Sequence, residues 1–235
     1  MEKNILITGL PHSGKSTSLH NLVSGIKNKN GFLTKEITAD GSRVGFEIEL
    51  SNGQRIAFAH VAYDESVRVS RYGVKVKNLE LALQEIPKPT SETLLYLDEV
   101  GQMQLFSGKF KEKVLDYLEL PNTFVATVSA VFKSDFIDSL KKRSDVIWVS
   151  VTPENRQDIS LFLNDIVRKI ETAKTYLREP LRFTRENESI ITMTSKHGAR
   201  TLSKLDNNWR CTCDFCAKWA ICSHLIAAKE LFNLS

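Results

Sequence analysis

The stretch NILITGLPHSGKSTSLHNLVSGI, residues 4–26, decides the fold. It begins with a short apolar run at residues 4–8, of the kind that forms a buried strand in a parallel sheet. A glycine-rich loop follows, and then apolar residues at the spacing i, i+3, i+4 and i+7 predict an amphipathic helix. These apolar residues are Leu19, Leu22, Val23 and Ile26. The order strand, loop, helix predicts the start of an α/β fold.

The loop at residues 9–16, GLPHSGKS, matches the pattern G-x-x-x-x-G-K-[ST] without a mismatch. In such a loop the backbone N–H groups surround phosphate oxygens, and the following helix adds the positive end of its dipole. Lys15 is expected to reach the β- and γ-phosphates, and Ser16 to coordinate Mg²⁺. The predicted phosphate-binding residues are Gly9, Leu10, Pro11, His12, Ser13, Gly14, Lys15, Ser16 and Thr17.

The second part of the predicted site is the acidic segment LLYLDEVG at residues 94–101. Its four apolar residues predict a buried strand that ends in two adjacent carboxylates beside the loop. We expect Asp98 to bind Mg²⁺ through water and Glu99 to orient or deprotonate an attacking water molecule. The pair favours hydrolysis over transfer to a small acceptor, because a hydrolase needs a base for water.

Between these two elements the chain changes character. Three β-rich runs are separated by ADGSR and SNGQ, which contain the hairpin-turn dipeptides Asp40-Gly41 and Asn52-Gly53. This pattern predicts an antiparallel β meander inserted into the α/β fold. The later strand candidates are residues 94–97, 124–128 and 146–151, and the helix candidates are residues 109–119, 134–143 and 153–176. Their alternation predicts a mainly parallel sheet covered on both faces.

All four cysteines lie in RCTCDFCAKWAICSH, residues 210–224. The chain shows no signal peptide and no apolar run of about 20 residues, so we expect a cytoplasmic or nuclear protein without membrane contact. In a reducing compartment clustered cysteines bind metal more often than they form disulfides. Zn²⁺ takes four ligands, and two sets remain open. One is Cys211, Cys213, Cys222 and His224, and the other has Cys216 in place of Cys211.

The domain boundaries follow from composition. Residues 178–188, REPLRFTRENE, are rich in charge, and we place a linker at 177–189 between a domain at 1–176 and a small one at 190–235. The small domain has two strand-like segments before the cysteines and a helix-like segment after them. A closed site with four protein ligands leaves no open position for water, so we expect it to be structural. A unit of this size has a poor core, and the metal would supply folding free energy.

Five segments together resemble the cancer-related, or thermophile-type, nucleoside-triphosphatase family of P-loop NTPases. They are GLPHSGKST, GFLTKEITADGSRVGFEIEL, VRVSRYGV, LDEVGQMQLFSGKF and RSDVIWVSVTPENR, in the family's order over about residues 1–172. The resemblance implies a RecA-like sheet, Mg²⁺-dependent hydrolysis of ATP, GTP or other NTPs to NDP, and loose base selectivity. Gln102 and Gln104 stand where the family usually has charged residues, and Ser70 and Arg71 also depart from its pattern. Asp98, Glu99 and Lys15 are intact, so we expect hydrolysis to be retained, and the departures bear on its rate or coupling.

Phosphoryl transfer usually requires a cation near the developing charge. Arg68 and Arg71 are the foremost candidates, because they lie in a segment that resembles the family. Arg43 and Arg143 are the others, and the sequence does not choose among them.

The C-terminal segment resembles the SWIM zinc finger, C-x-C…C-x-H, over about residues 190–232. The resemblance favours Cys211, Cys213, Cys222 and His224 as zinc ligands, predicts a ββα fold, and implies binding to DNA, RNA or protein. Nucleic acid is the expected partner, although nine Lys or Arg against six Asp or Glu in residues 177–235 predict modest affinity. Aromatic side chains that could stack on bases or form the core are Trp209, Phe215 and Trp219.

Two other functions remain open. A P-loop nucleotide or nucleoside kinase would need an acceptor pocket and an arginine-rich lid, and the pair Asp98-Glu99 disfavours it. A slow nucleotide-dependent switch or adaptor would be compatible with Gln102 and Gln104, and multiple-turnover rates distinguish it from a hydrolase.

Overall fold

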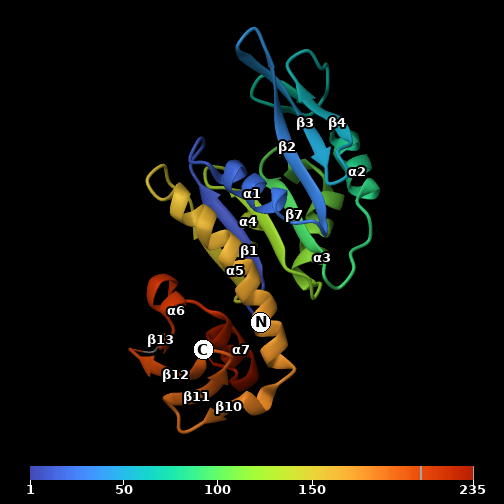
Figure 1. Cartoon of the computed structure of the whole chain (residues 1–235). Helices are drawn as coiled ribbons and strands as arrows, with labels where there is room; N and C mark the ends of the chain where they lie inside the picture. The colour runs from blue at the N-terminus through green and yellow to red at the C-terminus, as the bar shows by residue number, and fades with distance from the viewer. Residues whose placement is uncertain (207, 235) are drawn as a thin grey trace. The chain divides into compact units, whose positions relative to one another are not determined.

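The computed structural model describes residues 1–206 and 208–234, and it forms two compact units. One unit is Lys3–Leu161, and the other joins Met1–Glu2 to the chain from Phe162 onward. The division falls inside helix α5 (Arg156–Leu177), about fifteen residues before the boundary expected at 176. Figure 1 shows the elements of both units along the chain.

The first unit contains a nine-stranded sheet. Its strands are β1 (Asn4–Gly9), β2 (Lys29–Ala39), β3 (Ser42–Leu50), β4 (Arg55–His60), β5 (Arg68–Val69), β6 (Tyr72–Val74), β7 (Leu94–Val100), β8 (Phe124–Ser129) and β9 (Val146–Ser150). Its complete helices are α1 (Lys15–Ser24), α2 (Val76–Glu85), the 3-10 turn η1 (Gln104–Phe106), α3 (Gly108–Glu119) and α4 (Asp135–Lys141). Helix α2 was not expected, although its buried Leu79, Ala82 and Leu83 follow helical spacing.

The strand order β5-β6-β4-β3-β2-β7-β8-β1-β9 makes the sheet mixed, whereas the sequence predicted a mainly parallel one. Strands β2, β7, β8, β1 and β9 run parallel, and β3, β4, β6 and β5 extend the sheet in antiparallel pairs. The predicted meander therefore exists, but as a continuation of the same sheet. This is possible because the start of β2, Lys29–Phe32, pairs with β7, and the rest pairs with β3.

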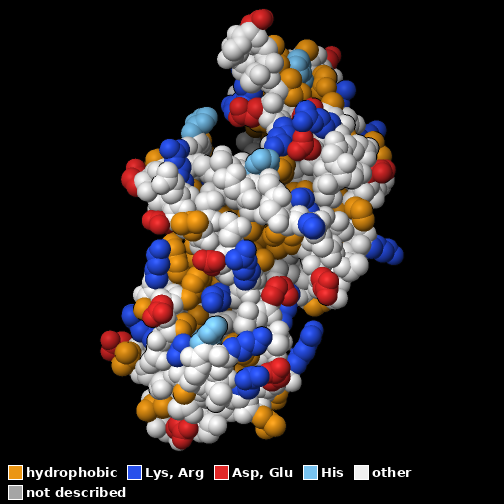
Figure 2. Space-filling model, in the orientation of Figure 1, with side chains coloured by type: hydrophobic (Ala, Val, Ile, Leu, Met, Phe, Trp, Pro, Cys, Tyr) orange, Lys and Arg blue, Asp and Glu red, His pale blue; other side chains and the backbone are white. Residues whose placement is uncertain are grey.

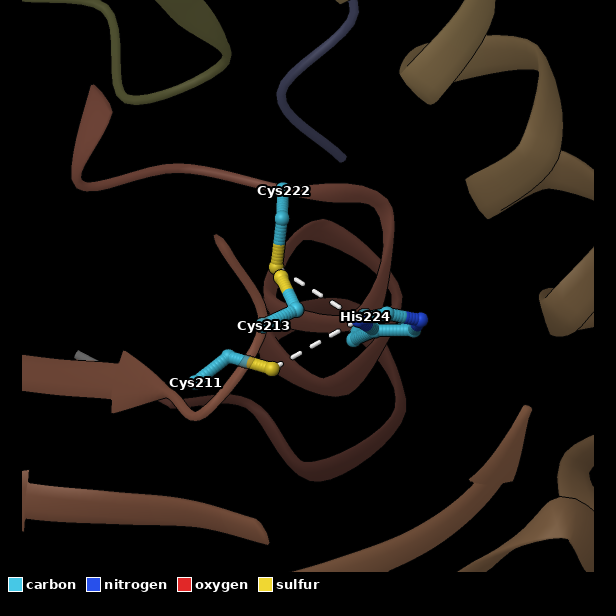
Figure 3. Close-up of side chains that lie close together, drawn as sticks. All are labelled: Cys211, Cys213, Cys222 and His224. Carbon is cyan, nitrogen blue, oxygen red and sulfur yellow. Dashed lines mark hydrogen bonds between the residues drawn. The ribbon is translucent and has the colours of Figure 1, made fainter. Parts of the chain in front are cut away.

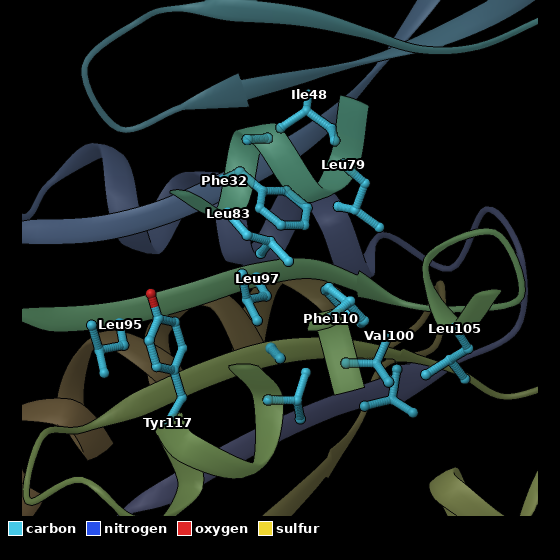
Figure 4. Packing of buried hydrophobic residues seen from close by; sticks show 14 of the residues in the cluster. Phe32, Ile48, Leu79, Leu83, Leu95, Leu97, Val100, Leu105, Phe110 and Tyr117 are labelled. Carbon is cyan, nitrogen blue, oxygen red and sulfur yellow. The ribbon is translucent and has the colours of Figure 1, made fainter. Parts of the chain in front are cut away.

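Alternation along the central strands assigns side chains to the two faces of the sheet. Leu6 of β1 belongs to the large core cluster on the face covered by α2, α3 and α4, and Figure 4 shows part of this cluster around Phe32 and Phe110. Ile5 and Ile7 are also fully buried but lie outside that cluster, on the opposite face. Such burial on both faces explains the uninterrupted apolar run that predicted β1.

The second unit holds a four-stranded antiparallel sheet in the order β10-β11-β12-β13. Its elements after α5 are η2 (Pro180–Arg182), β10 (Phe183–Arg185), β11 (Ile190–Ser195), β12 (Gly198–Leu205), β13 (Asn208–Cys211), α6 (Asp214–Trp219) and α7 (Ser223–Phe232). The predicted ββα fold is thus too simple. The expected linker 177–189 contains η2 and β10, because Phe183 is buried and β10 pairs with β11 despite the charged residues around it.

The N-terminus of the chain contributes to this second unit. The Met1 ammonium pairs with Glu230 at 2.5 Å, and Lys229 pairs with Glu2 at 2.9 Å, so both contacts join the first two residues to α7. Over the described parts of the chain, no helix combines the length and apolarity that a membrane span requires.

Candidate functional site

The glycine-rich loop leaves β1 at Gly9 and enters α1 at Lys15. Gly9 has a φ of 154°, and a Cβ there would lie 2.3 Å from the Val151 carbonyl oxygen, so only glycine fits this position. Gly14 caps α1 with a φ of 105°, a left-handed conformation that again favours glycine. The two glycines of the motif are therefore explained by close packing and by backbone conformation.

Lys15 is buried at the start of α1, and its Nζ donates hydrogen bonds to the carbonyl oxygens of Gly9 at 2.8 Å and Leu10 at 3.1 Å. The ammonium thus lies inside the concave side of the loop. The buried Ser13 Oγ has no hydrogen-bond partner among the described residues. A buried hydroxyl without a partner in such a loop is suited to an oxygen-rich ligand.

Asp98 lies near the end of β7, two residues before Val100, and it faces Ser16 of α1. Its Oδ1 accepts a hydrogen bond from Ser16 Oγ at 3.0 Å and another from Thr127 Oγ1. Its backbone carbonyl accepts a hydrogen bond from Thr34 Oγ1. Burial raises the pKa of Asp98, and the bonds from Thr127 and Ser16 partly oppose this shift. A carboxylate and a hydroxyl placed together in this way fit Mg²⁺, which prefers oxygen ligands.

Glu99 is the next residue, and its side chain lies over Gly101, where a Cβ would come within 2.8 Å of Glu99 Cγ and Oε1. Gly101 therefore leaves room for the Glu99 carboxylate. Burial and repulsion from Asp98 raise the pKa of Glu99, while Lys15 opposes the shift. A carboxylate with a raised pKa is a stronger base than an ordinary glutamate.

These residues line one cavity of about 580 Å³. The lining residues are Pro11, His12, Gly14, Lys15, Ser16, Thr17, Thr34, Glu36, Arg43, Phe46, Asp98, Glu99 and Arg156. The structure therefore brings the predicted loop and the predicted acidic pair together. The size is within the range of ligand sites in proteins.

Two arginines, Arg43 and Arg156, line this cavity. Arg68 and Arg71 are not among the described residues that line it. Arg68 donates hydrogen bonds to the carbonyl oxygens of Tyr63 at 3.1 Å and Arg71 at 3.0 Å. Arg71 donates to the carbonyl oxygen of Arg43. Both predicted arginines thus contact backbone oxygens, and Arg71 supports the strand that carries Arg43.

Arg43 lies on β3, where it faces β2. Its guanidinium pairs with Glu36 at 2.6 Å and donates to the Tyr72 hydroxyl at 3.2 Å, which lowers the pKa of Tyr72. It also lies 5.1 Å from the centre of the Phe46 ring. Arg143, the fourth candidate, pairs with Asp145 and Glu119, and these contacts account for its charge.

The two glutamines differ in their surroundings. Gln104 is buried, and its Nε2 donates to Thr34 Oγ1 at 3.4 Å, so it reaches the Asp98 carbonyl through Thr34. Gln102 is exposed. Sequence reasoning missed Thr34, Thr127 and Arg156. Thr127 was detectable, because it lies at the end of a predicted parallel strand, next to the strand of Asp98.

The second site is the cysteine cluster. The ligand atoms of Cys211, Cys213, Cys222 and His224 all lie within 4.8 Å of one another, and Figure 3 shows them converging on one point. His224 Nδ1 is 3.5 Å from Cys211 Sγ and 3.8 Å from Cys222 Sγ. Cys216 is separate from this group, and its Sγ accepts a hydrogen bond from the backbone N–H of Cys211 at 3.3 Å.

The local fold explains why these side chains meet. Cys211 ends β13, and Cys222 caps α7 by accepting a hydrogen bond from the Leu225 N–H at 3.4 Å. The hydrogen bond from Cys222 lowers the pKa of Cys211, and the pKa of Cys222 is raised in return. Burial lowers the pKa of His224, but bonds to Cys211 and Cys213 outweigh it and raise the pKa overall. Such a set holds thiolate charge close to an imidazole, as metal sites do.

The predicted stacking rings have other contacts. Trp209 is buried, while the ring of Phe162 lies 6.1 Å from Phe215 and 4.7 Å from Trp219. These aromatic residues therefore contribute to the packing of their own unit.

A phosphate loop between β1 and α1, together with an acidic pair near the end of β7, a parallel strand separated from β1 by β8, defines the class of P-loop nucleoside-triphosphatase folds. The family model described as NTPase matches residues 4–166. The chain belongs to this NTPase family, and by family it is an enzyme. The C-terminal cysteines lie outside the matched residues.

Individual relatives agree with this assignment. The chain is 34% identical over 166 residues to "Nucleoside-triphosphatase THEP1" of Thermotoga sp. (strain RQ2), covering 69% of this chain and 92% of that protein. It is 28% identical over 192 residues to the human "Cancer-related nucleoside-triphosphatase", covering 74% of this chain and 100% of that protein. The crystal structure of THEP1 from Aquifex aeolicus matches with a TM-score of 0.60 at 30% identity, covering 72% of this chain and 99% of that one.

Proposed function

We propose that the first unit hydrolyses nucleoside triphosphates to nucleoside diphosphate and phosphate with Mg²⁺. The observation that carries the proposal is that Lys15, Ser16, Asp98 and Glu99 line one cavity, with Ser16 hydrogen-bonded to Asp98. The names of the relatives, which are nucleoside-triphosphatases, support the same activity. ATP, GTP and related triphosphates are the proposed substrates.

Each residue has a role that its position supports. Lys15 exchanges its two carbonyl partners for phosphate oxygens, and the loop N–H groups bind the β-phosphate. Ser16 and Asp98 would hold Mg²⁺, which when bound neutralises charge on the β- and γ-phosphate oxygens. Glu99 accepts a proton from the attacking water, and its raised pKa makes it a stronger base than an ordinary glutamate.

Arg43 is the proposed cation on the side of the γ-phosphate. It lines the cavity together with Thr34 and Glu99, and its pairing with Glu36 holds it there in the absence of substrate. The phosphates would compete with Glu36 for the guanidinium. Arg43 was one of the four candidates that the sequence left open, among which Arg68 and Arg71 were foremost.

The test is multiple-turnover release of phosphate from ATP, GTP, CTP and UTP, with Mg²⁺ and with EDTA. We expect turnover with Mg²⁺, loss of turnover with EDTA, and loss in Lys15→Ala. Product analysis with added nucleosides and nucleoside monophosphates tests the kinase alternative. A phosphorylated acceptor, or a single turnover without further cycles, would contradict the proposal.

For the second unit we propose a structural zinc site formed by Cys211, Cys213, Cys222 and His224, as in a SWIM-type finger. The mutual distances within 4.8 Å and the soft thiolate donors fit tetrahedral Zn²⁺, and four protein ligands leave no position for catalysis. We also propose that residues from about 183 onward form this domain, with β10 as its first strand. Metal content per chain tests the site.

We propose nucleic acid as the partner of the second unit. The support is charge alone, from exposed side chains such as Arg210 and Lys218, because the rings of Trp209, Phe215 and Trp219 pack within the unit. Figure 2 shows basic and acidic side chains interspersed on the face in view, which agrees with modest affinity. Binding to single- and double-stranded DNA and RNA at about 50 and 200 mM salt tests this partner. A lack of binding at the lower salt would contradict it.

A further inference from the structure

A second cavity of about 480 Å³ adjoins the phosphate cavity in the first unit. The two cavities share Gly14, Thr17 and Arg156. The second cavity lies between α1 and the first turns of α5, and it contains none of the acidic residues of the phosphate cavity. It therefore offers a continuous path away from the phosphate loop.

The direction of a bound triphosphate follows from the residues around the loop. Asp98 and Glu99 must face the γ-phosphate, since the metal and the attacking water act there. Thr17 follows Ser16 and lines both cavities, and the backbone N–H groups at this end of the loop meet the α-phosphate. The nucleoside must leave the loop beyond the α-phosphate, and on that side the cavity leads past Thr17 and Arg156.

The groups in this second cavity suit a base and a ribose. The stem of Arg156 lies over Gly14, with its Cβ and Cδ each 3.7 Å from the position of a glycine Cβ. Its guanidinium has no hydrogen bond or ion pair with any described residue. A planar cation of this kind stacks on aromatic faces. Leu161 is 64% exposed and provides an apolar contact at the same cavity.

The polar groups there do not select one base. The side-chain amides of Asn21 and Gln157 are exposed, and within the described parts of the chain neither has a partner. Each amide carries a donor and an acceptor, and rotation exchanges them. Two such amides can pair with the edge of adenine or of guanine.

We propose that this second cavity binds the base and ribose of the substrate, with the Arg156 guanidinium stacked on the base and Asn21 and Gln157 at its edge. The proposal rests on the proposed function, because it takes the direction of the triphosphate from the roles of Asp98 and Glu99. It assigns the nucleoside to a site on α1 and α5, and it predicts that recognition tolerates different bases.

The test compares ligands with and without a nucleoside. Calorimetry measures the binding of Mg²⁺-ADP, Mg²⁺-GDP and Mg²⁺-pyrophosphate to the full chain and to Arg156→Ala. We expect ADP and GDP to bind about tenfold more weakly to the variant, since stacking on a cation is worth about that much, and pyrophosphate binding to stay within about twofold. Arg156→Lys, which keeps the charge without the plane, should also weaken only the nucleotides. Arg168→Ala, an exposed arginine further along α5, is the matched control.

A second variant tests the cavity itself. Leu161→Trp fills it from an exposed position and should weaken ADP and GDP while pyrophosphate binds normally. If Arg156→Ala weakens pyrophosphate as much as ADP, Arg156 is a phosphate ligand and the proposal is wrong. Unchanged ADP binding in both variants also overturns it. These measurements do not depend on turnover, so a failure of NTP hydrolysis is recognised separately, by the absence of phosphate release.

Discussion

Replacing Glu99 with glutamine separates the chemical role of this residue from its effect on stability. The amide keeps the size and the place over Gly101 but cannot accept a proton from water. A general base contributes about 10²–10⁴-fold to the rate. We therefore expect kcat to fall by that factor, which corresponds to about 3–5.5 kcal/mol in the activation free energy, while Mg²⁺-ADP binds with an affinity within a few-fold of that of the parent chain.

The same substitution should stabilise the free protein. The pKa of Glu99 is raised by burial and by Asp98, so its ionised form costs free energy in the folded state at neutral pH, by about 1.4 kcal/mol for each unit of the shift. Glu99→Gln removes this cost. The gain should be greatest at pH values above the raised pKa, and it should shrink as the pH falls and Glu99 in the parent chain takes up a proton.

The assay combines steady-state phosphate release with thermal unfolding in EDTA at a series of pH values from about 8 down to about 4.5, the ordinary pKa of glutamate. Glu92→Gln is the control, because Glu92 is exposed and does not line the phosphate cavity. A kcat within threefold of the parent value would refute the role of Glu99 as the base. A lower stability of Glu99→Gln at pH 8 would refute the argument from burial.

Three further predictions concern other parts of the molecule. Phe110→Ala, in the fully buried core, should lower the free energy of unfolding by about 3–5 kcal/mol in denaturant titrations, and a loss under 1 kcal/mol would contradict the packing. Cys211→Ser should lose zinc and Cys216→Ser should retain it by metal analysis, and equal retention would leave the ligand set without support. Asp145→Asn should lower stability at pH 7 by about 1–3 kcal/mol. Burial raises the pKa of Asp145, but Arg143 outweighs this effect and lowers the pKa overall. The difference in stability between Asp145→Asn and the parent chain should therefore vanish as the pH falls below about 4. A difference in stability that persists there would refute the pairing.

The phosphate loop could be predicted from the sequence because all its constraints are local. The close approach of Gly9 to Val151 and the left-handed Gly14 restrict residue type directly, and the motif records both restrictions. The acidic pair was also predictable, since two adjacent carboxylates directly after four apolar residues are unusual, although β7 continues through them to Val100. They meet the loop because β7, β8 and β1 run parallel, so that their carboxyl ends share one edge of the sheet.

The arginines could not be predicted in the same way. Arg43 lies in the antiparallel strand β3 and Arg71 in the turn between β5 and β6. Whether either side chain reaches the cavity depends on strand register and on bulges such as those at Ile37/Thr38 and Phe46/Glu47. A shift of the strand register by one residue moves each side chain to the opposite face of the sheet. Resemblance to a family segment favoured Arg68 and Arg71, but the geometry brings Arg43 to the cavity.

The fold of the second unit was predicted least well, for a related reason. Charge in residues 178–188 indicated a linker, yet the three-residue strand β10 needs only Phe183 in the core and hydrogen bonds to β11. Its other two side chains, of Thr184 and Arg185, remain exposed. The charge content of a segment does not show which of its side chains alternate between the core and the solvent. The cysteine cluster was predictable because its ligand types are rare in the chain and closely spaced.

The two glutamines that depart from the family pattern have different physical consequences. Gln102 is exposed, so a charge there would be solvated and would act on Glu99 only weakly. Gln104 is buried and donates to Thr34, which in turn donates to the carbonyl of Asp98. A carboxylate at this position would add a third buried negative charge beside two acids whose pKa values burial already raises. The neutral amide avoids that repulsion while it positions the strand end that carries Asp98, so the departure is compatible with a working site.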